Sequence, residues 1–358
     1  KPFATVLLLF IGSFSFAQNS ATVSLKTAIE MAKATNIDLK IADAEIQKQS
    51  VLKKTAFDAD PLQIEYQGGQ FNGKAYDHNI SVQQYFPIGK ITKANRQLQE
   101  ELSKLAEKRK ALSEYEIEKA VTLSYYQYLF GISIQKLNNE LDEIYTKFLK
   151  NAELRFKTGE SGNIEVLSAR AKVKEIEMIK EQLKYDLAIY QKQFQFFIQT
   201  QEDIVPDSST PIQFVAESDW NQNKVEGLMK DFYQQQISVY QKEANTFKGQ
   251  RTPKLGLGYF AQSIDTQFYY HGFTAGLQIP LFGGVNTAKA KASEISISQS
   301  QLELDKNTLS LKLRRQELQN EFEKQQKGLD YYQKEGLQYA EQIIATAQKS
   351  YANGDMSY

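Results

Sequence analysis

Two stretches of the chain alternate apolar residues with polar or small ones, and each leads into a very long segment without proline. In the later stretch, residues 271–284, apolar side chains occupy every second position before Pro280. These apolar positions are Phe273, Ala275, Leu277 and Ile279. The period of two predicts a β-strand with one apolar face, and the run rich in Ala, Lys, Glu, Gln and Leu from residue 286 predicts a helix. An earlier stretch, residues 78–89, has the same order of elements.

The two stretches belong to an internal repeat. Matching residues recur 192 to 195 positions apart along the chain. The recurring pairs are Pro61 with Pro253, His78 with His271, Pro87 with Pro280, and Gly159 with Gly354. Because self-similarity of this kind indicates one structural unit written twice, we expect a first repeat over residues 18–200 and a second over 220–358. Residues 201–219, which contain Pro206 and Pro211, are expected to link them.

The fold class expected from the pattern is mainly α with a small β part. The first repeat is predicted to contain helices over 22–34 (capped by Ser24) and 37–59, strands over 62–67 and 80–83, and long helices over 92–157 and 163–199. The second repeat is predicted to contain a helix over 225–248, strands over 255–261 and 273–279, and a long helix over 286–351. Gly159 lies at the tip of the first helical hairpin. The return helix of the second repeat is missing before Tyr358, so we expect a truncated sequence.

The second long helix carries two apolar columns at sevenfold spacing. One column contains Ile295, Leu302 and Leu309, and the other contains Ile297, Leu304, Leu311 and Leu318. Two residues correspond to about 200° of helix rotation, so the columns lie on opposite sides of the helix. We therefore expect this helix to be held between two flanking helices in a single-layer wall that can close into a tube. The first long helix shows one clear column, at Leu98, Leu105 and Leu112.

The N-terminal residues resemble a targeting segment. Residues 1–17 begin with Lys1, continue with an apolar core and end with small residues at Ser15 and Ala17. This order is typical of a signal peptide, so we expect export and cleavage between Ala17 and Gln18. The alternative is the end of a transmembrane segment from a fused preceding domain. Beyond this segment no apolar run is long enough for a membrane-spanning helix. If the chain enters a membrane, we therefore expect it to do so with β-strands.

Composition excludes several classes of function. Lys and Arg total 43, as do Asp and Glu, and the chain has no Cys. The charge balance gives no basic field for nucleic acid, and the lack of Cys excludes disulfides, thiol nucleophiles and a lipid-anchored N-terminus. Nothing in the sequence supplies acid–base or covalent chemistry, so we expect neither an enzyme nor a cofactor. The two histidines, His78 and His271, lack a second ligand at fixed spacing, which favours a strand-end role over a metal site.

These elements carry a resemblance to a known family. Two rounds of short helix, strand pair and long helix are similar to the TolC family of outer-membrane efflux channels. The local matches are Ser24–Asn36, Arg155–Gly159 with Val166 and Leu167, and Gln278–Gly284. The resemblance covers essentially everything after Gln18 and includes the Pro before each long helix.

The resemblance implies a homotrimer whose twelve-stranded β-barrel in the outer membrane continues as an α-helical tunnel through the periplasm. A barrel shared by several chains also follows from the strands, because four strands are too few to close and open edges cannot lie in hydrocarbon. The strand residues expected to contact lipid are Leu255, Leu257, Tyr259, Phe273, Ala275, Leu277 and Ile279. Pro87, Gly89, Pro280 and Gly283 are expected at the strand-to-helix turns.

The partners implied are a periplasmic adaptor, which is a membrane fusion protein, and an inner-membrane transporter, to which the chain could be fused. The adaptor is expected to dock at the hairpin tips, at Arg155, Gly159, Tyr351 and Gly354. The implied function is a passive exit duct for drugs, metal ions or other small solutes, and a heavy-metal or cation efflux system is one option. The gating residues stay open, because Met356 stands where some relatives have a gating arginine and the acidic residues expected further on lie beyond Tyr358. The alternative function is a periplasmic coiled-coil adaptor or spacer without a channel.

Overall fold

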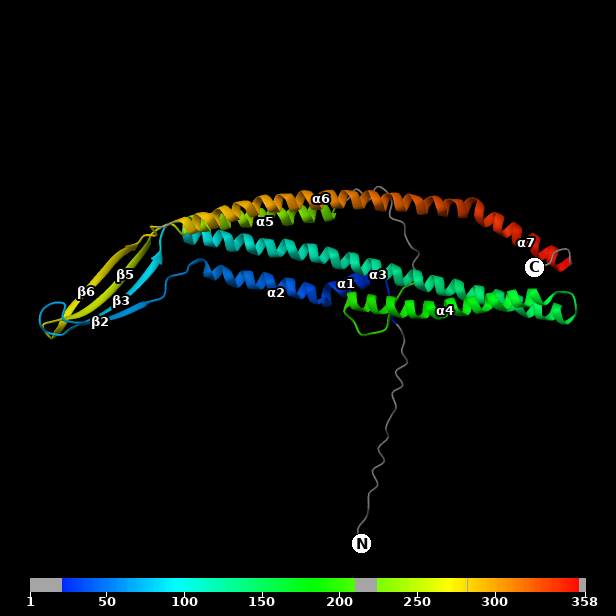
Figure 1. The fold of residues 1–358 in the computed structure, drawn as a ribbon, viewed down its shortest axis with the longest axis horizontal. Helices are drawn as coiled ribbons and strands as arrows, with labels where there is room; N and C mark the ends of the chain where they lie inside the picture. Colours follow the sequence, from blue (N-terminus) through cyan, green and yellow to red (C-terminus); the bar gives the residue numbers. More distant parts are fainter. Residues whose placement is uncertain (1–20, 210–223, 282, 354–358) are drawn as a thin grey trace, which may run out of the picture. The chain divides into compact units, whose positions relative to one another are not determined.

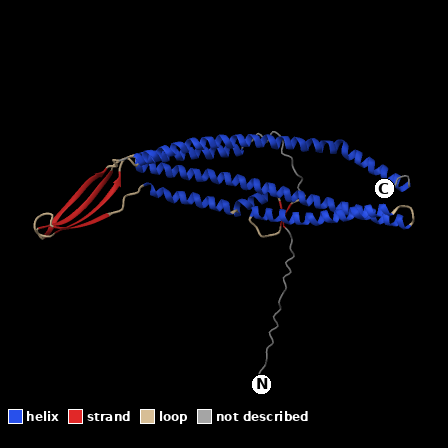
Figure 2. Ribbon diagram, viewed as in Figure 1, coloured by secondary structure: helices blue, strands red, loops and turns tan. Residues whose placement is uncertain are grey.

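The computed structural model describes residues 21–209, 224–281 and 283–353. Among these residues, one compact unit comprises residues 21–36 and 117–209, and a second comprises residues 37–116, 224–281 and 283–353. The expected cleavage site at Ala17 and Gln18 lies outside the described residues, as do Gly354 and Met356. Most described residues are helical, and the strands are few, which confirms a mainly α fold with a small β part (Figure 2).

The first unit is built on α1 (Leu25–Thr35), α4 (Asn163–Ile198) and the second part of α3 (Ile91–Lys157). Ser24 caps α1 as predicted, since its side chain accepts a hydrogen bond from the Thr27 amide at 3.2 Å. Two strands, β1 (Ala21–Val23) and β4 (Ile204–Pro206), pair in parallel. The pattern predicted neither strand, because three residues are too few to show a period of two.

Aromatic side chains fill the core of the first unit between α3 and α4. Phe194 and Ile198 are fully buried, and the Phe194 ring lies 5.8 Å from the ring of Tyr125. The Tyr125 hydroxyl donates to the Val23 carbonyl at 3.2 Å, which ties the β1 strand to the helices. Burial raises the pKa of both Tyr125 and Tyr128, so these phenols remain neutral. The contacts indicate that they serve packing.

The second unit contains a four-stranded antiparallel sheet in the order β2–β3–β5–β6 (Figure 1). Its strands are β2 (Gln63–Gly69), β3 (Asp77–Pro87), β5 (Lys254–Ile264) and β6 (Gln267–Gln278). Asp265 and Thr266 form the whole connection between β5 and β6, both with positive φ, which is the geometry of a two-residue hairpin turn. Pro280 follows β6, as predicted.

Four described α-helices of this unit lead into or out of the strands of the sheet: α2 (Ile37–Leu52), the first part of α3, α5 (Lys224–Gly249) and α6 (Gly284–Tyr331). The prediction that α2 extends to residue 59 is wrong. After Leu52 a short 3₁₀ helix follows over Lys53–Ala56, in which the Thr55 hydroxyl donates to the Leu52 carbonyl at 2.7 Å. Such side-chain bonds compete with helical continuation.

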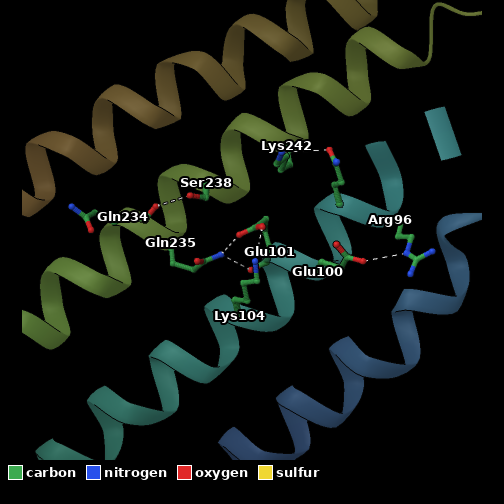
Figure 3. Close-up of polar contacts among 9 residues, drawn as sticks. Arg96, Glu100, Glu101, Lys104, Gln234, Gln235, Ser238 and Lys242 are labelled. Carbon is green, nitrogen blue, oxygen red and sulfur yellow. Dashed lines mark hydrogen bonds and ion pairs between the residues drawn. The ribbon is translucent and has the colours of Figure 1, made fainter. Parts of the chain in front are cut away.

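Ion pairs and hydrogen bonds place α3 between α2 and α5. Figure 3 shows the hydrogen bonds from Gln235 of α5 to Glu101 of α3. Lys110 contacts Asp43 of α2 at 2.7 Å, and Lys108 contacts Asp231 of α5 at 2.7 Å. On the far side of α5, Lys248 pairs with Glu294 of α6 at 2.9 Å. The order of helices in this unit is therefore α2–α3–α5–α6, which repeats the order of the strands to which they connect.

The contact between α3 and α5 is expected to weaken in acid. Burial alone would raise the pKa of Glu101, but hydrogen bonds from Gln235 and Lys104 hold this pKa below its ordinary value. A carboxylate with a depressed folded-state pKa contributes stability above its unfolded pKa of about 4.3, and this contribution is lost as pH falls through the folded value. Glu101→Gln should therefore flatten the acid limb of a chemical-unfolding profile measured from pH 7 down to pH 3. An unchanged acid limb would contradict this assignment, and Glu100→Gln, on the more exposed neighbour, is the control.

The long second helix is not a single α-helix. A π-helical segment, Tyr332–Gly336, separates α6 from α7 (Leu337–Asn353), which corrects the prediction of one α-helix over 286–351. The Leu337 amide donates to the Tyr332 carbonyl across this segment. A Cβ on Gly336 would lie 2.9 Å from the Tyr332 ring, so glycine leaves the room that this ring occupies. In the described part of the chain, none of the helices is both long and apolar enough to cross a membrane.

Candidate functional site

The four-stranded sheet of the second unit has a central row of apolar residues. Strand pairing aligns Ile64 of β2 with Val82 of β3, then Tyr259 of β5 and Phe273 of β6. Tyr259 is the middle residue of β5, which runs from Lys254 to Ile264. Because paired residues on neighbouring strands point to the same face, these four side chains share one face of the sheet.

The rows on either side extend the same apolar face. Toward the helices, Leu257 pairs with Ala275, and Phe86 is followed across the sheet by Leu255 and Leu277. Phe273 is 87% exposed and Leu277 is 60% exposed, so this chain leaves the face uncovered. The structure thus brings together six of the seven strand residues selected from the sequence. The seventh, Ile279, follows the last residue of β6 and is also exposed.

The first hairpin contributes apolar residues that were not selected from the sequence. They are Ile64, Tyr66, Ile80, Val82 and Phe86. Gln84 interrupts this set, but its amide donates to the Asp60 carbonyl at 3.2 Å. The alternation of apolar and polar residues could have identified this apolar face from the sequence, because the strands continue in register across Gln84.

The opposite face of the sheet is mainly polar. Glycines on this face accommodate neighbouring side chains that lie across them. The Tyr85 ring lies over Gly256, where a Cβ would be 2.6 Å from the ring, while Phe260 covers Gly272 and Thr274 covers Gly258. Amides occupy much of the rest of the face. The sheet therefore has one apolar and one polar side, as the period of two predicted.

Both outer strands of the sheet have a free edge. β2 pairs with β3 alone and β6 pairs with β5 alone among the described strands. Unpaired strand edges present open amide and carbonyl groups, which favour pairing with another strand. Within the described residues, both edges of this four-stranded sheet are therefore open.

Each histidine pairs with a tyrosine of its own hairpin. Nδ1 of His78 lies 2.7 Å from the Tyr66 hydroxyl, and Nδ1 of His271 lies 2.7 Å from the Tyr259 hydroxyl. The rings stack in both pairs. Within the described residues, no three His, Cys, Asp or Glu side chains gather as a metal site. This arrangement places both histidines on the apolar face, near the loop end of the sheet.

The loop ends of the two hairpins are joined by side-chain contacts. Ser263 is almost fully buried; its hydroxyl accepts from the His78 amide at 2.8 Å and lies 3.3 Å from the Asp77 carboxylate. The Asn72 amide donates to the Ser263 carbonyl at 3.3 Å. These contacts hold β3 and β5 in register where the strands end.

The strand-to-helix turns differ between the two hairpins. Pro87 is the last residue of β3, and Gly89 follows with φ of +82°, a conformation that favours glycine. Gly283 instead is the N-cap of α6 with φ of −84°, and a Cβ there would meet the Arg251 guanidinium at 2.9 Å. Backbone conformation favours glycine at the first turn, whereas a side chain at the second turn would only require the Arg251 side chain to shift.

The two apolar columns of α6 have different surroundings. Ile297, Leu304 and Leu311 of one column are partly buried on the side of α5, but its last member, Leu318, is 53% exposed. In the other column, Ile295, Leu302 and Leu309 are 62%, 65% and 59% exposed. Figure 1 shows α5 lying along α6, and Asn307 of α6 donates to the Tyr233 hydroxyl of α5 at 2.8 Å. One of the two flanking helices that the pattern predicted is therefore α5. The described residues leave the other column uncovered.

At the first helical tip, Gly159 ends α3 in a Schellman motif. The Glu160 amide donates to the Arg155 carbonyl at 2.9 Å, the Gly159 amide donates to the Phe156 carbonyl at 3.1 Å, and Gly159 has φ of +79°. Exposed apolar side chains surround this turn. They are Leu154, Phe156, Ile164 and Leu167. The side chain of Tyr351 and the whole of Gly354, expected at the second tip, lie outside the described residues.

Apolar residues of the first unit that the sequence analysis did not select also remain uncovered. On α3 they recur at sevenfold spacing as Leu123, Phe130, Leu137 and Ile144. Beside this column, α3 and α4 form an open apolar groove of about 880 Å³, lined by Leu123, Tyr185, Ile189, Phe196 and Phe197 among others. The sevenfold spacing could have revealed the column, but the groove depends on how α3 and α4 pack.

Comparison with solved structures identifies the fold. The chain is similar to CusC, whose structures describe transmembrane channel formation, with 18% identity and a TM-score of 0.69 over 96% of this chain and 87% of CusC. It is similar to the outer-membrane channel OprN, with 12% identity and a TM-score of 0.75 over 93% of this chain and 81% of OprN. The outer membrane protein VceC of Vibrio cholerae matches at 14% identity and a TM-score of 0.70, over 92% of this chain and 86% of VceC. No protein-family model matches the sequence, and no curated protein sequence matches it.

These similarities confirm the resemblance at the level of the fold. Identities of 12–18% are too low to transfer residue roles, but the coverage extends over nearly the whole chain. The chain has the fold of bacterial outer-membrane channels.

Proposed function

We propose that this chain is one subunit of a TolC-family outer-membrane channel, a passive exit duct for small solutes from the periplasm. The observation that carries the proposal is the incomplete sheet of the second unit. It has an uncovered apolar face, a polar face and two free edges, in a chain with the fold of outer-membrane channels. Several copies sharing one barrel would cover the edges and turn the apolar face toward lipid.

The helices of the second unit support the same closure. Their order, α2–α3–α5–α6, follows that of the strands, so neighbouring chains that join β6 to β2 would also join α6 to α2. Both outer helices carry exposed apolar residues, such as Leu302 on α6 and Ile41 on α2. Three chains would supply twelve strands, a number within the known range of membrane barrels. The assembly proposed is a homotrimer, with a helical tunnel in the periplasm.

The repeat organisation is part of this proposal. The two repeats occupy residues 18–200 and 220–358, with the linker at 201–219. A hairpin followed by a long helix occurs twice in the described elements, as β2–β3–α3 and as β5–β6–α6. Each repeat would thus contribute one hairpin to the barrel. Residues 1–17 are proposed to direct export, so that the channel resides in the outer membrane.

The tips of the helical hairpins are proposed to dock a periplasmic adaptor, which in turn recruits an inner-membrane transporter. The support is the exposed apolar group around Gly159, at the turn that joins α3 to α4. Residues proposed for docking are Arg155, Gly159, Tyr351 and Gly354. Solute selection would belong mainly to the transporter, and no catalytic step is assigned to this chain.

The competing function is a periplasmic coiled-coil adaptor or spacer. A spacer needs long helices, but it has no use for a sheet whose central row exposes Phe273 and Tyr259 on one face. The solved structures that this chain resembles are those of outer-membrane channels. Both arguments favour the channel.

The decisive experiment is expression of the full-length gene product, followed by membrane fractionation and recording in planar lipid bilayers. A channel subunit should sediment with the outer membrane, require detergent for extraction, run as an oligomer and conduct ions. A monomer that remains water-soluble without detergent would overturn the proposal in favour of a spacer.

Valine in place of Gly159 is expected to abolish efflux while leaving barrel insertion intact. Gly159 has φ of +79°, and an L-residue in this region costs about 1–2 kcal/mol, more when it is β-branched. Solute accumulation in cells that depend on this channel measures the effect. Gly162→Ala is the matched control, because Gly162 has φ of −82° and accepts a side chain without strain. Normal efflux with Gly159→Val would remove the docking role from this tip.

A further inference from the structure

The polar face of the sheet carries few charges. Besides the amides of residues such as Gln63, Gln67 and Gln83, its charged residues are Glu65, Asp77 and Lys254. Lys254 forms an ion pair with Asp60 at 2.5 Å. Asp77 is fully buried at the loop end of the sheet. Among the described strand residues of this face, Glu65 is the one exposed charge that no ion pair neutralises.

The surroundings of Glu65 leave its carboxylate accessible to water. It lies on β2, opposite Ser81 of β3, one residue from the central row. Across the sheet, Ser81 pairs with Phe260 of β5, and the Phe260 ring covers Gly272 of β6. The Gln67 amide donates a hydrogen bond of 3.0 Å to the Glu65 carboxylate and orients it. Neither this row nor the neighbouring amides place a cation beside it.

We propose that Glu65 sets the charge preference of the barrel, so that cations pass more readily than anions. The inference rests on the proposed channel, in which the polar face lines the lumen and each chain contributes one carboxylate to a ring at the same depth. Rings of acidic side chains favour cations in water-filled pores, because the field is strongest where a low-dielectric wall surrounds the water. The solutes favoured in this part of the duct are cationic or neutral hydrogen-bonding molecules, and anionic solutes are disfavoured.

Ionic strength gives the proposal a second signature. The Debye length is about 30 Å at about 0.01 M salt, which is long compared with the spacing of side chains across a pore. At about 1 M it falls to roughly 3 Å, and the ring then acts only on ions that touch it. The preference for cations should therefore be strong in dilute salt and weak in concentrated salt.

The test is the reversal potential of the reconstituted full-length channel in planar bilayers under a KCl gradient. At about 0.01 M salt, Glu65→Gln should lower the ratio of K⁺ to Cl⁻ permeability by about twofold or more, while Glu65→Asp should keep it. Glu65→Lys should shift the ratio further toward Cl⁻. Gln67→Glu, which adds a carboxylate on the same face, should raise it.

The outcomes separate this inference from the channel itself. Because the helical part of the duct is the same in every variant, differences in permeability ratio report the barrel. Equal ratios for wild type, Glu65→Gln and Glu65→Lys in conducting channels would overturn the role of Glu65 and leave the channel intact. A wild-type protein that inserts no conducting pores would overturn the proposed function and this inference with it.

Discussion

Arginine in place of Phe273 is expected to cost about 2–4 kcal/mol of folding free energy in a lipid bilayer, as a cation at the midplane of a membrane barrel does. Phe273 lies in the central row of the sheet, opposite Tyr259, and is 87% exposed. β5 and β6 have 11 and 12 residues, close to the length of strands that cross a bilayer at a tilt. The middle of these strands is therefore the expected midplane.

The cost should depend on depth along the strand. Leu277 is on the same face but is the penultimate residue of β6, at the end nearest the helices. Arginine there should cost only about 0–1 kcal/mol, because the side chain can reach the headgroup region. Thr274 and Gln278 follow these two residues on the polar face. Thr274→Arg and Gln278→Arg are the matched controls, and both should be tolerated.

Urea titration of the protein folded into vesicles measures these free energies. The channel proposal requires Phe273→Arg to lower the folding free energy most and Leu277→Arg to lower it less. Both controls should have folding free energies near that of the wild type. Equal costs at Phe273 and Thr274 would mean that the two faces of the sheet meet the same solvent, and the lipid-facing assignment would fail.

Long periodic elements were predictable from the sequence, and contacts across the fold were not. The predicted helix over residues 92–157 corresponds to α3 because no proline and a single glycine, Gly131, interrupt it. β1 and β4 were missed because each has three residues, and their pairing joins residues about 180 positions apart. The π segment at Tyr332 was missed because it depends on how one ring packs against Gly336.

For the candidate site, the sequence predicted which residues share a face but not how far the face extends. Alternation alone identified Leu255, Leu257 and Tyr259, and the register of β5 with β6 then matched them to Leu277, Ala275 and Phe273. The contribution of the first hairpin required the register of β3 with β5, which links Val82 to Tyr259. Pairing between distant strands is set by packing and by contacts such as those of Ser263, so one sequence does not reveal it.

Lysine in place of Leu302 is expected to prevent the trimer while the single chain keeps its helices. Leu302 belongs to the column of α6 that α5 leaves uncovered, whereas Leu304 faces α5. In the proposed assembly this column packs against α2 of the next chain, so the substitution would bury an unpaired ammonium at each of the seams. Burying such a charge costs several kcal/mol.

The measurement is the molar mass of the detergent-extracted protein by light scattering, together with its helix content by circular dichroism. Ser310→Lys is the matched control, because Ser310 is exposed on α6 about 100° around the helix from Leu309. The proposal requires the wild type and Ser310→Lys to be trimeric, and Leu302→Lys to be monomeric with unchanged helix content. A trimeric Leu302→Lys variant would show that α6 makes no essential contact between chains. The contacts that join the helices of neighbouring chains would then have to use the uncovered column of α3 from Leu123 to Ile144.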